Sequence, residues 1–95
     1  MPDPIGQVFS ALADPNRRQV LGYISRCGSG TATELTAELP ITRQAISKHL
    51  AALADAGLVE SERRGRETRY HLTRMGEEWD ERLDALARHL RERRQ

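Results

Sequence analysis

The stretch that decides the fold is ITRQAISKHLAALADAGL, residues 41–58. Thr42 predicts the start of a helix, because its hydroxyl can accept a hydrogen bond from a backbone N–H of the first turn. Gly57 predicts the end, because glycine readily adopts the left-handed conformation that follows a helix C-terminus. One face of this helix is apolar and is expected to be buried: Ile46, Leu50 and Leu53, with Ala45 and His49 beside them. The sequence therefore predicts a helix over residues 42–56.

The opposite face of this helix carries few charged side chains. At about 100° per residue it presents Gln44, Ser47, Lys48 and Ala51, with Arg43 on its flank. A solvated helix face usually carries long charged side chains of both signs, whereas this one has a central cation, two hydrogen-bonding side chains and small alanines. Such a face lets another surface come close, and it favours a helix that lies in the major groove of DNA.

Three shorter helices are predicted before it, over residues 5–13, 14–27 and 31–39. The first has apolar side chains at positions i, i+3, i+4 and i+7. The second begins at Asp14-Pro15, an N-cap followed by a proline that fits the first helical position. The third opens with Thr31 and Glu34 at capping-box spacing, and Thr33 is the alternative N-cap. A short helix, a tight turn and a longer helix with an open outer face make a helix-turn-helix.

Beyond residue 57 the hydrophobic period changes from helical to alternating. Residues 58–72 predict two strands around a turn at Arg64-Gly65, because glycine supplies the positive φ that a tight hairpin turn needs. Four arginines crowd this hairpin: Arg63, Arg64, Arg66 and Arg69. Glu62 and Glu67 are their expected intramolecular counterions. A basic hairpin after a helix-turn-helix is the wing of a winged helix, and it suits contact with phosphates or the minor groove.

The remaining stretch, residues 73–93, predicts one long helix with a near-heptad apolar stripe. A chain of 95 residues forms one domain, residues 1–95, and buries only a modest core by itself. We therefore expect a mostly α fold with a small β-hairpin, dimerised through its first and last helices. The side chains expected in the dimer interface are Ile5, Val8, Phe9, Leu12, Met75, Trp79, Leu83, Leu86 and Leu90.

The net charge of +1 hides a local asymmetry. Residues 42–72 hold six basic and four acidic side chains, residues 1–41 hold three and four, and residues 73–95 hold six of each. The positive excess therefore lies on the open-faced helix and the hairpin, which are the two elements expected to contact DNA.

Cys27 is the only cysteine, so no internal disulfide can form and a reducing cytoplasm is the expected location. No apolar run approaches the roughly 20 residues of a membrane span, and the first residues, MPDP, lack the basic and apolar regions of a signal peptide. We expect Cys27 to be a small buried residue. A redox role for this thiol stays open, although no second cysteine could resolve it.

The order and spacing of these motifs resemble the ArsR family of bacterial winged-helix repressors. The resemblance spans residues 8–72 and rests on FSALADPNRR at 9–18, EL at 34–35, residues 42–53, AGLV at 56–59 and residues 65–70. It implies a homodimer that occupies an operator, often in its own promoter, and leaves it when an inducer binds. The last helix, with Trp79 and RLDAL at 82–86, resembles a metal-free branch of small autorepressors.

Many ArsR-like proteins sense metals through cysteines at the start of the third helix, or through Asp and His residues on the last one. The corresponding third-helix positions here are Thr31 and Thr33, and the neighbours of Arg74 provide no carboxylate-and-histidine set. Cysteine and histidine lie on four different predicted elements, at Cys27, His49, His71 and His89. We therefore expect no metal site and no cofactor. A metal site shared across the dimer through His89 stays open.

The predicted function is that of a homodimeric, sequence-specific DNA-binding transcriptional repressor on an inverted repeat. The expected DNA contacts are Thr42, Arg43, Gln44, Ser47, Lys48 and His49 on the helix, and Arg63, Arg64, Arg66 and Arg69 on the wing. Arg43 and Gln44 suit base edges, because their side chains can make two bonds to guanine and adenine respectively. The other helix residues suit phosphates, and for His49, on the inner side, packing is the alternative.

The two alternative classes of function are a protein-interaction module and an enzyme. A protein-interaction module, such as an antitoxin or an adaptor, could use the winged helix to grip another protein. An enzyme is not expected, because no nucleophile–base pair, phosphate-binding glycine loop or pair of catalytic carboxylates stands out. The inducer, small-molecule or redox, is not identified by the sequence.

Overall fold

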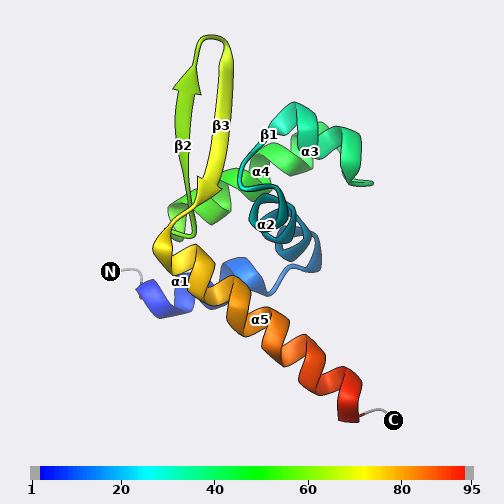
Figure 1. Cartoon of the computed structure of the whole chain (residues 1–95). Helices are drawn as coiled ribbons and strands as arrows, with labels where there is room; N and C mark the ends of the chain where they lie inside the picture. The colour runs from blue at the N-terminus through cyan, green and yellow to red at the C-terminus, as the bar shows by residue number, and fades with distance from the viewer. Residues whose placement is uncertain (1–2, 94–95) are drawn as a thin grey trace.

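A computed structural model describes residues 3–93 as five helices and a small three-stranded sheet (Figure 1). The elements are, in chain order, α1 Pro4–Leu12, α2 Pro15–Cys27, β1 Gly30–Thr31, α3 Ala32–Glu38, α4 Arg43–Asp55, β2 Val59–Arg64, β3 Glu67–Leu72 and α5 Arg74–Arg93. Helices α3 and α4 form the helix-turn-helix, and β2 and β3 form the wing. The predicted fold class, a winged helix-turn-helix, is confirmed.

Local capping signals set the ends of the central helices. Asp14, Thr31 and Thr42 are the N-caps of α2, α3 and α4, and each side chain accepts a hydrogen bond from the backbone of the following turn. Thr31 and Glu34 form the predicted capping box. Gly57 follows α4 with a φ of 80°, the left-handed conformation expected of it.

The sheet contains one strand that the sequence does not predict. β1 pairs antiparallel with β3, with Gly30 opposite Tyr70 and Thr31 opposite Arg69, so the strand order is β1-β3-β2. A strand of two residues has no periodicity to recognise. Its pairing joins the base of the wing to the start of α3, and it therefore positions the wing beside the helix-turn-helix.

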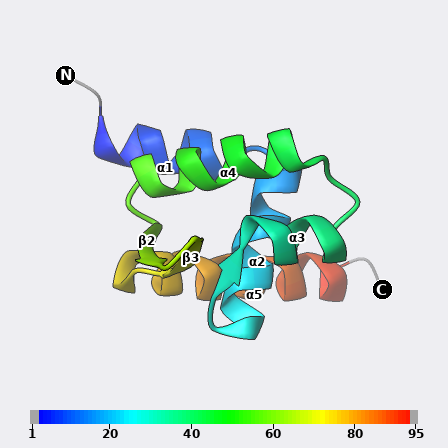
Figure 2. The same cartoon turned by 90° about the horizontal axis from the view of Figure 1, so that it is seen from above.

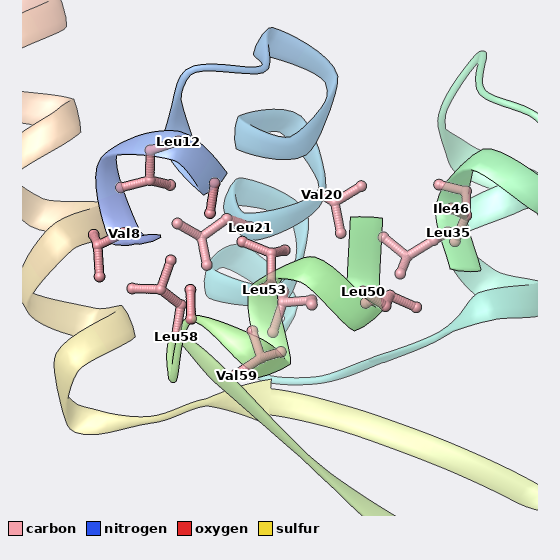
Figure 3. Close-up of a cluster of buried hydrophobic side chains, with 13 residues drawn as sticks. Val8, Leu12, Val20, Leu21, Leu35, Ile46, Leu50, Leu53, Leu58 and Val59 are labelled. Atoms are coloured by element: carbon pink, nitrogen blue, oxygen red, sulfur yellow. The ribbon is translucent and has the colours of Figure 1, made fainter. Parts of the chain in front are cut away.

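The hydrophobic core lies between α1, α2, α3, α4 and the start of β2 (Figure 3). Its largest fully buried side chains are Val20, Leu21, Ile24, Leu35, Ile46, Leu50, Leu53 and Leu58. Val8 and Leu12 belong to the same core, with only 3% and 6% of their surface exposed. This corrects their expected place in a dimer interface: α1 packs on α2 of its own chain, and these two side chains have almost no area left for a partner.

Helix α5 covers this core with its first half only. Met75, Trp79 and Leu83 are partly buried against the core, and the Trp79 ring meets the Phe9 ring edge to face at 5.5 Å between centroids. In Figure 1, α1 and α5 lie at the end of the molecule opposite the tip of the β2–β3 hairpin. Figure 2, the view from above, shows α3 and α4 in front of α2, α1 and α5. Within residues 3–93, no helix combines the length and the apolar character that a membrane crossing needs.

The joint between α4 and α5 is closely packed. The Thr73 hydroxyl donates to the Gly57 carbonyl at 2.6 Å and accepts from the Gly76 N–H at 3.1 Å. The Thr73 N–H donates to the Leu58 carbonyl at 3.1 Å. A Cβ atom on Gly76 would overlap the Leu58 carbonyl oxygen. The absence of a side chain at position 76 therefore lets α5 begin directly against the end of α4.

Candidate nucleic-acid interface

The outer face of α4 is exposed and carries the side chains predicted for it. Arg43, Gln44, Ser47 and Lys48 are all exposed, and together they line one surface groove. Thr42, the N-cap, is exposed at the start of the same face. The structure thus brings five of the six helix residues predicted to contact DNA to one accessible surface.

Arg43 forms a hydrogen bond with a residue of the neighbouring helix, α3. Its Nη1 atom donates a hydrogen bond to the Thr33 hydroxyl at 3.1 Å. Thr33 lies in the first turn of α3, so the two helices of the helix-turn-helix share a polar contact beside the groove. The sequence does not single out Thr33 for this role, because the two residues are ten positions apart and belong to different helices.

His49, the sixth helix residue, points inward. Its side chain is only 7% exposed, and its Nδ1 atom accepts a hydrogen bond from Nε of Arg17 at 3.3 Å. His49 follows Ile46 by three residues, so it lies on the face of α4 that packs on α2. The structure therefore favours the packed alternative for His49 over a contact with DNA.

The tip of the wing presents three exposed arginines, Arg63, Arg64 and Arg66. Nη2 of Arg64 and Oε2 of Glu62 are 3.2 Å apart, which confirms Glu62 as a counterion. Both side chains are more than half exposed, so this ion pair contributes little to stability and can exchange for a phosphate. Gly65 has a φ of 61° at the turn, as the sequence predicts.

Arg69, the fourth wing arginine, faces the protein. Its Nη1 and Nη2 atoms donate to the two carboxylate oxygens of Glu34, both at 3.2 Å, and Nη1 also donates to the Ser29 hydroxyl at 2.9 Å. Glu67 is 3.6 Å away, which confirms it as a counterion. In this structure Arg69, which stands opposite Thr31 in the sheet, directs its guanidinium toward α3 and not toward the exposed side of the wing tip.

Comparisons with known proteins agree with this geometry. A family model described as a helix-turn-helix domain matches residues 12–62, more than half of the chain. An uncharacterized HTH-type transcriptional regulator of Bacillus subtilis, YuzN, is 48% identical over 65 residues, which cover 62% of this chain and 71% of YuzN. A solved ArsR-like transcriptional regulator from Rhodococcus is 40% identical, with a TM-score of 0.69 over 90% of this chain and 91% of that one. The chain belongs to the ArsR family.

A second solved structure bears on assembly within the ArsR family. It is the homodimeric winged helix-turn-helix DNA-binding domain, fragment 1–100, of a possible ArsR-family transcriptional regulator from Mycobacterium bovis. It is 28% identical, has a TM-score of 0.75, and covers 95% of this chain and 80% of that one. The similarity therefore extends beyond the helix-turn-helix to nearly the whole of this ArsR-family chain.

Exposed apolar side chains of this ArsR-family chain lie on its first and last helices. Ile5 is 64% exposed, Phe9 57%, and Leu86 and Leu90 54% each. We call these four residues the α1/α5 patch. They come from the stripe predicted to form a dimer interface, of which Met75, Trp79 and Leu83 are half-covered by the chain itself.

Two further observations on this ArsR-family chain concern Cys27 and metal binding. Cys27 is exposed at the end of α2, so the expectation that it is buried is wrong: α2 ends there, at the edge of the core. Within residues 3–93, no group of three His, Cys, Asp or Glu side chains is arranged to hold a metal ion.

The Glu34–Arg69 pair has a mutual effect on ionisation. The hydrogen bonds from the Arg69 guanidinium and from the Thr31 N–H lower the pKa of Glu34 below its ordinary value of 4.5. The Glu34 carboxylate in turn raises the pKa of Arg69. Both groups are therefore charged at neutral pH.

We expect Glu34→Gln to lower the free energy of unfolding at pH 6 and to lower it less in acid. Because the folded-state pKa of Glu34 lies below the unfolded one, the stability due to its charge is fully present above about pH 4.5 and is lost as the pH falls through the folded pKa. Urea unfolding of both proteins at pH 6 and pH 3 measures the gap between them. A gap that does not narrow at pH 3 would contradict this account.

Proposed function

We propose that this chain is a homodimeric, sequence-specific DNA-binding transcriptional repressor. The observation that carries the proposal is the exposed face of α4, on which Arg43, Gln44, Ser47 and Lys48 surround one groove. The tip of the wing hairpin lies at the end of the molecule opposite α1 and α5, and α4 lies between α1 and the hairpin tip (Figure 1). A helix in the major groove with a basic wing over the adjacent backbone is the arrangement that these elements suit.

The roles within this interface follow from the chemistry of each side chain. Arg43 and Gln44, in the first turn of α4, suit guanine and adenine edges. Thr42, Ser47 and Lys48 suit phosphates, which set the register on the duplex. The wing arginines that remain exposed are Arg63, Arg64 and Arg66, and they suit the backbone or the minor groove.

The proposed dimer uses the α1/α5 patch. Burying these four exposed apolar side chains against a second copy of the patch would remove their surface from water, which stabilises the dimer. The homodimeric state of the Mycobacterium bovis relative supports this assembly. In a two-fold dimer, the two α4 helices would enter successive major grooves about 34–36 Å apart on an inverted repeat. We propose that one chain, residues 1–95, supplies one winged-helix domain, and that the dimer acts on bacterial DNA in the cytoplasm, in the first instance on its own promoter, where occupancy excludes other proteins.

The test is the selection of bound fragments from genomic DNA, followed by titration of the selected duplex at several salt concentrations. Affinity should fall by about 10³ to 10⁵ between 50 and 200 mM salt, because a dimer that makes six to ten phosphate contacts releases the counterions bound there. Failure to select any fragment, or an affinity that salt does not change, would refute the proposal and favour a protein-interaction module.

The split between base reading and backbone contact gives a sharper prediction. Gln44→Ala should remove about 1–3 kcal/mol of discrimination at one base-pair position in each half-site, while affinity for unrelated duplexes stays nearly constant. Arg66→Ala, at the exposed wing tip, should weaken binding to all duplexes alike and lower the salt slope by about 1 for each wing.

Fluorescence anisotropy on a panel of single-base operator variants measures both effects. The two substitutions are controls for each other, because each removes one polar side chain from an exposed position. If both variants lost the same affinity for every duplex in the panel, Gln44 would not read bases.

A further inference from the structure

The first turn of α3 contacts both elements proposed to bind DNA. Glu34 receives the Arg69 guanidinium from β3 through two hydrogen bonds. Thr33, the adjacent residue, receives the Arg43 guanidinium from α4 at 3.1 Å. The α3 helix itself is not expected to enter a groove of DNA. Its contacts with Arg43 and Arg69 therefore bear on the positions of α4 and of the wing.

We propose that Glu34 is the positioning residue of the interface: through Arg69 it sets the direction of the wing, and through the first turn of α3 it holds Thr33 within reach of Arg43. The role of Glu34 in DNA binding rests on the proposed function. Its effect on the direction of the wing rests on the contacts within the chain. Arg69 then has a part in orienting the wing in place of a contact with phosphate.

The wing needs such a support, because its outer part has no core to pack on. In β2 only Val59 is buried, and the other five residues are exposed. Apolar packing therefore fixes the base of the hairpin and leaves its direction to polar contacts. A two-point guanidinium–carboxylate pair is suited to this, since both bonds form only when the two planar groups are aligned.

Glu34 joins three elements through one carboxylate. Oε1 accepts from the Thr31 N–H at 3.0 Å, which closes the α3 capping box, and from Nη1 of Arg69 at 3.2 Å. Thr31 in β1 stands directly opposite Arg69 in β3, and Ser29 receives the same Nη1 atom. With Glu34, Glu67 and Ser29 around it, the Arg69 guanidinium would have to leave all three partners to reach a phosphate.

The two roles of Arg69 predict opposite results for Glu34→Gln. If Arg69 binds phosphate, removing the carboxylate frees the guanidinium and takes a negative charge away from DNA, so binding tightens. If Glu34 positions the wing, the same change weakens binding. Glutamine also serves at the third position of a capping box, so α3 is expected to persist, and circular dichroism checks this.

The experiment compares Glu34→Gln, Arg69→Gln and the double variant with the parent on the duplex recovered by the genomic selection. Each single change should weaken binding by about 2- to 30-fold, the range for substitutions that act away from the contact surface. The double variant should bind the duplex no more weakly than the single variant with the lower affinity, because both changes break the same pair. Arg69→Gln should leave the salt slope unchanged, whereas the control Arg66→Gln should lower it by about 1 for each wing. Tighter binding by Glu34→Gln, or additive losses, would overturn the inference.

A measurement without DNA separates this inference from the proposed function. Backbone NMR order parameters of residues 68–70 should fall in Glu34→Gln and in Arg69→Gln, and they should stay at parent values in Arg66→Gln. Unchanged order parameters in the first two variants would overturn the inference by themselves. If the parent binds no duplex, the proposed function fails, and these order parameters still decide whether Glu34 holds the wing.

Discussion

Replacing Gly76 with alanine is expected to lower the free energy of unfolding by about 3 kcal/mol or more, a large fraction of the 5–15 kcal/mol typical of a folded domain. The new Cβ atom would overlap the Leu58 carbonyl oxygen, which is itself held by the Thr73 N–H at 3.1 Å. Backbone cannot swing aside as a flexible side chain can, so α5 must move off the end of α4. Urea unfolding followed by circular dichroism measures the loss.

Gly22→Ala is the matched control, since it makes the same change inside another helix, α2. A Cβ atom there would meet only the end of the flexible Arg26 side chain, at 3.2 Å. Alanine is the better helix former by about 1 kcal/mol, so this variant should be as stable as the parent or more stable. Similar stability for both variants would show that the close approach at Gly76 does not constrain the fold.

The sequence predicts what depends on neighbours three or four residues apart. The N-caps Asp14 and Thr42, the capping box at Thr31 and the glycine turns at 57 and 65 are all confirmed. Each of these features is a hydrogen bond or a backbone conformation that a short segment forms by itself. The exposed face of α4 follows equally from helical period, because its inner face is recognised by its apolar residues.

Contacts between distant segments are outside the reach of such patterns. Arg69 and Glu34 are 35 residues apart, and nothing near either residue indicates that a wing arginine faces α3. The helical period of apolar residues also identifies which face of a helix is buried, but it does not identify the segment that packs on that face. The pattern predicts a partner chain over Val8 and Leu12, whereas the core of the same chain buries them. The pairing of β1 with β3, which decides the direction of Arg69, involves only two residues of β1.

The double substitution Leu86→Glu with Leu90→Glu is expected to yield a folded monomer whose affinity for the selected duplex is about 10² to 10⁴ times lower than that of the parent. Each leucine is 54% exposed, so the isolated chain loses little by the change. In a two-fold dimer, however, every altered position occurs twice, and an unpaired carboxylate at an apolar interface costs several kcal/mol. Once the dimer separates, the two half-sites bind independently, and the advantage of a second, linked binding event disappears.

Ala85→Glu is the control for charge, because residue 85 is exposed on the same helix and lies about 100° or more away from the apolar stripe. It adds one carboxylate to α5, as each leucine substitution does, yet it should leave both the dimer and the DNA affinity intact. Sedimentation equilibrium gives the oligomeric state, anisotropy gives the affinity, and circular dichroism shows that the helices remain. A doubly substituted chain that is still dimeric would place the interface elsewhere than the α1/α5 patch, while a monomer that binds the duplex as tightly as the parent would separate DNA recognition from dimerisation altogether.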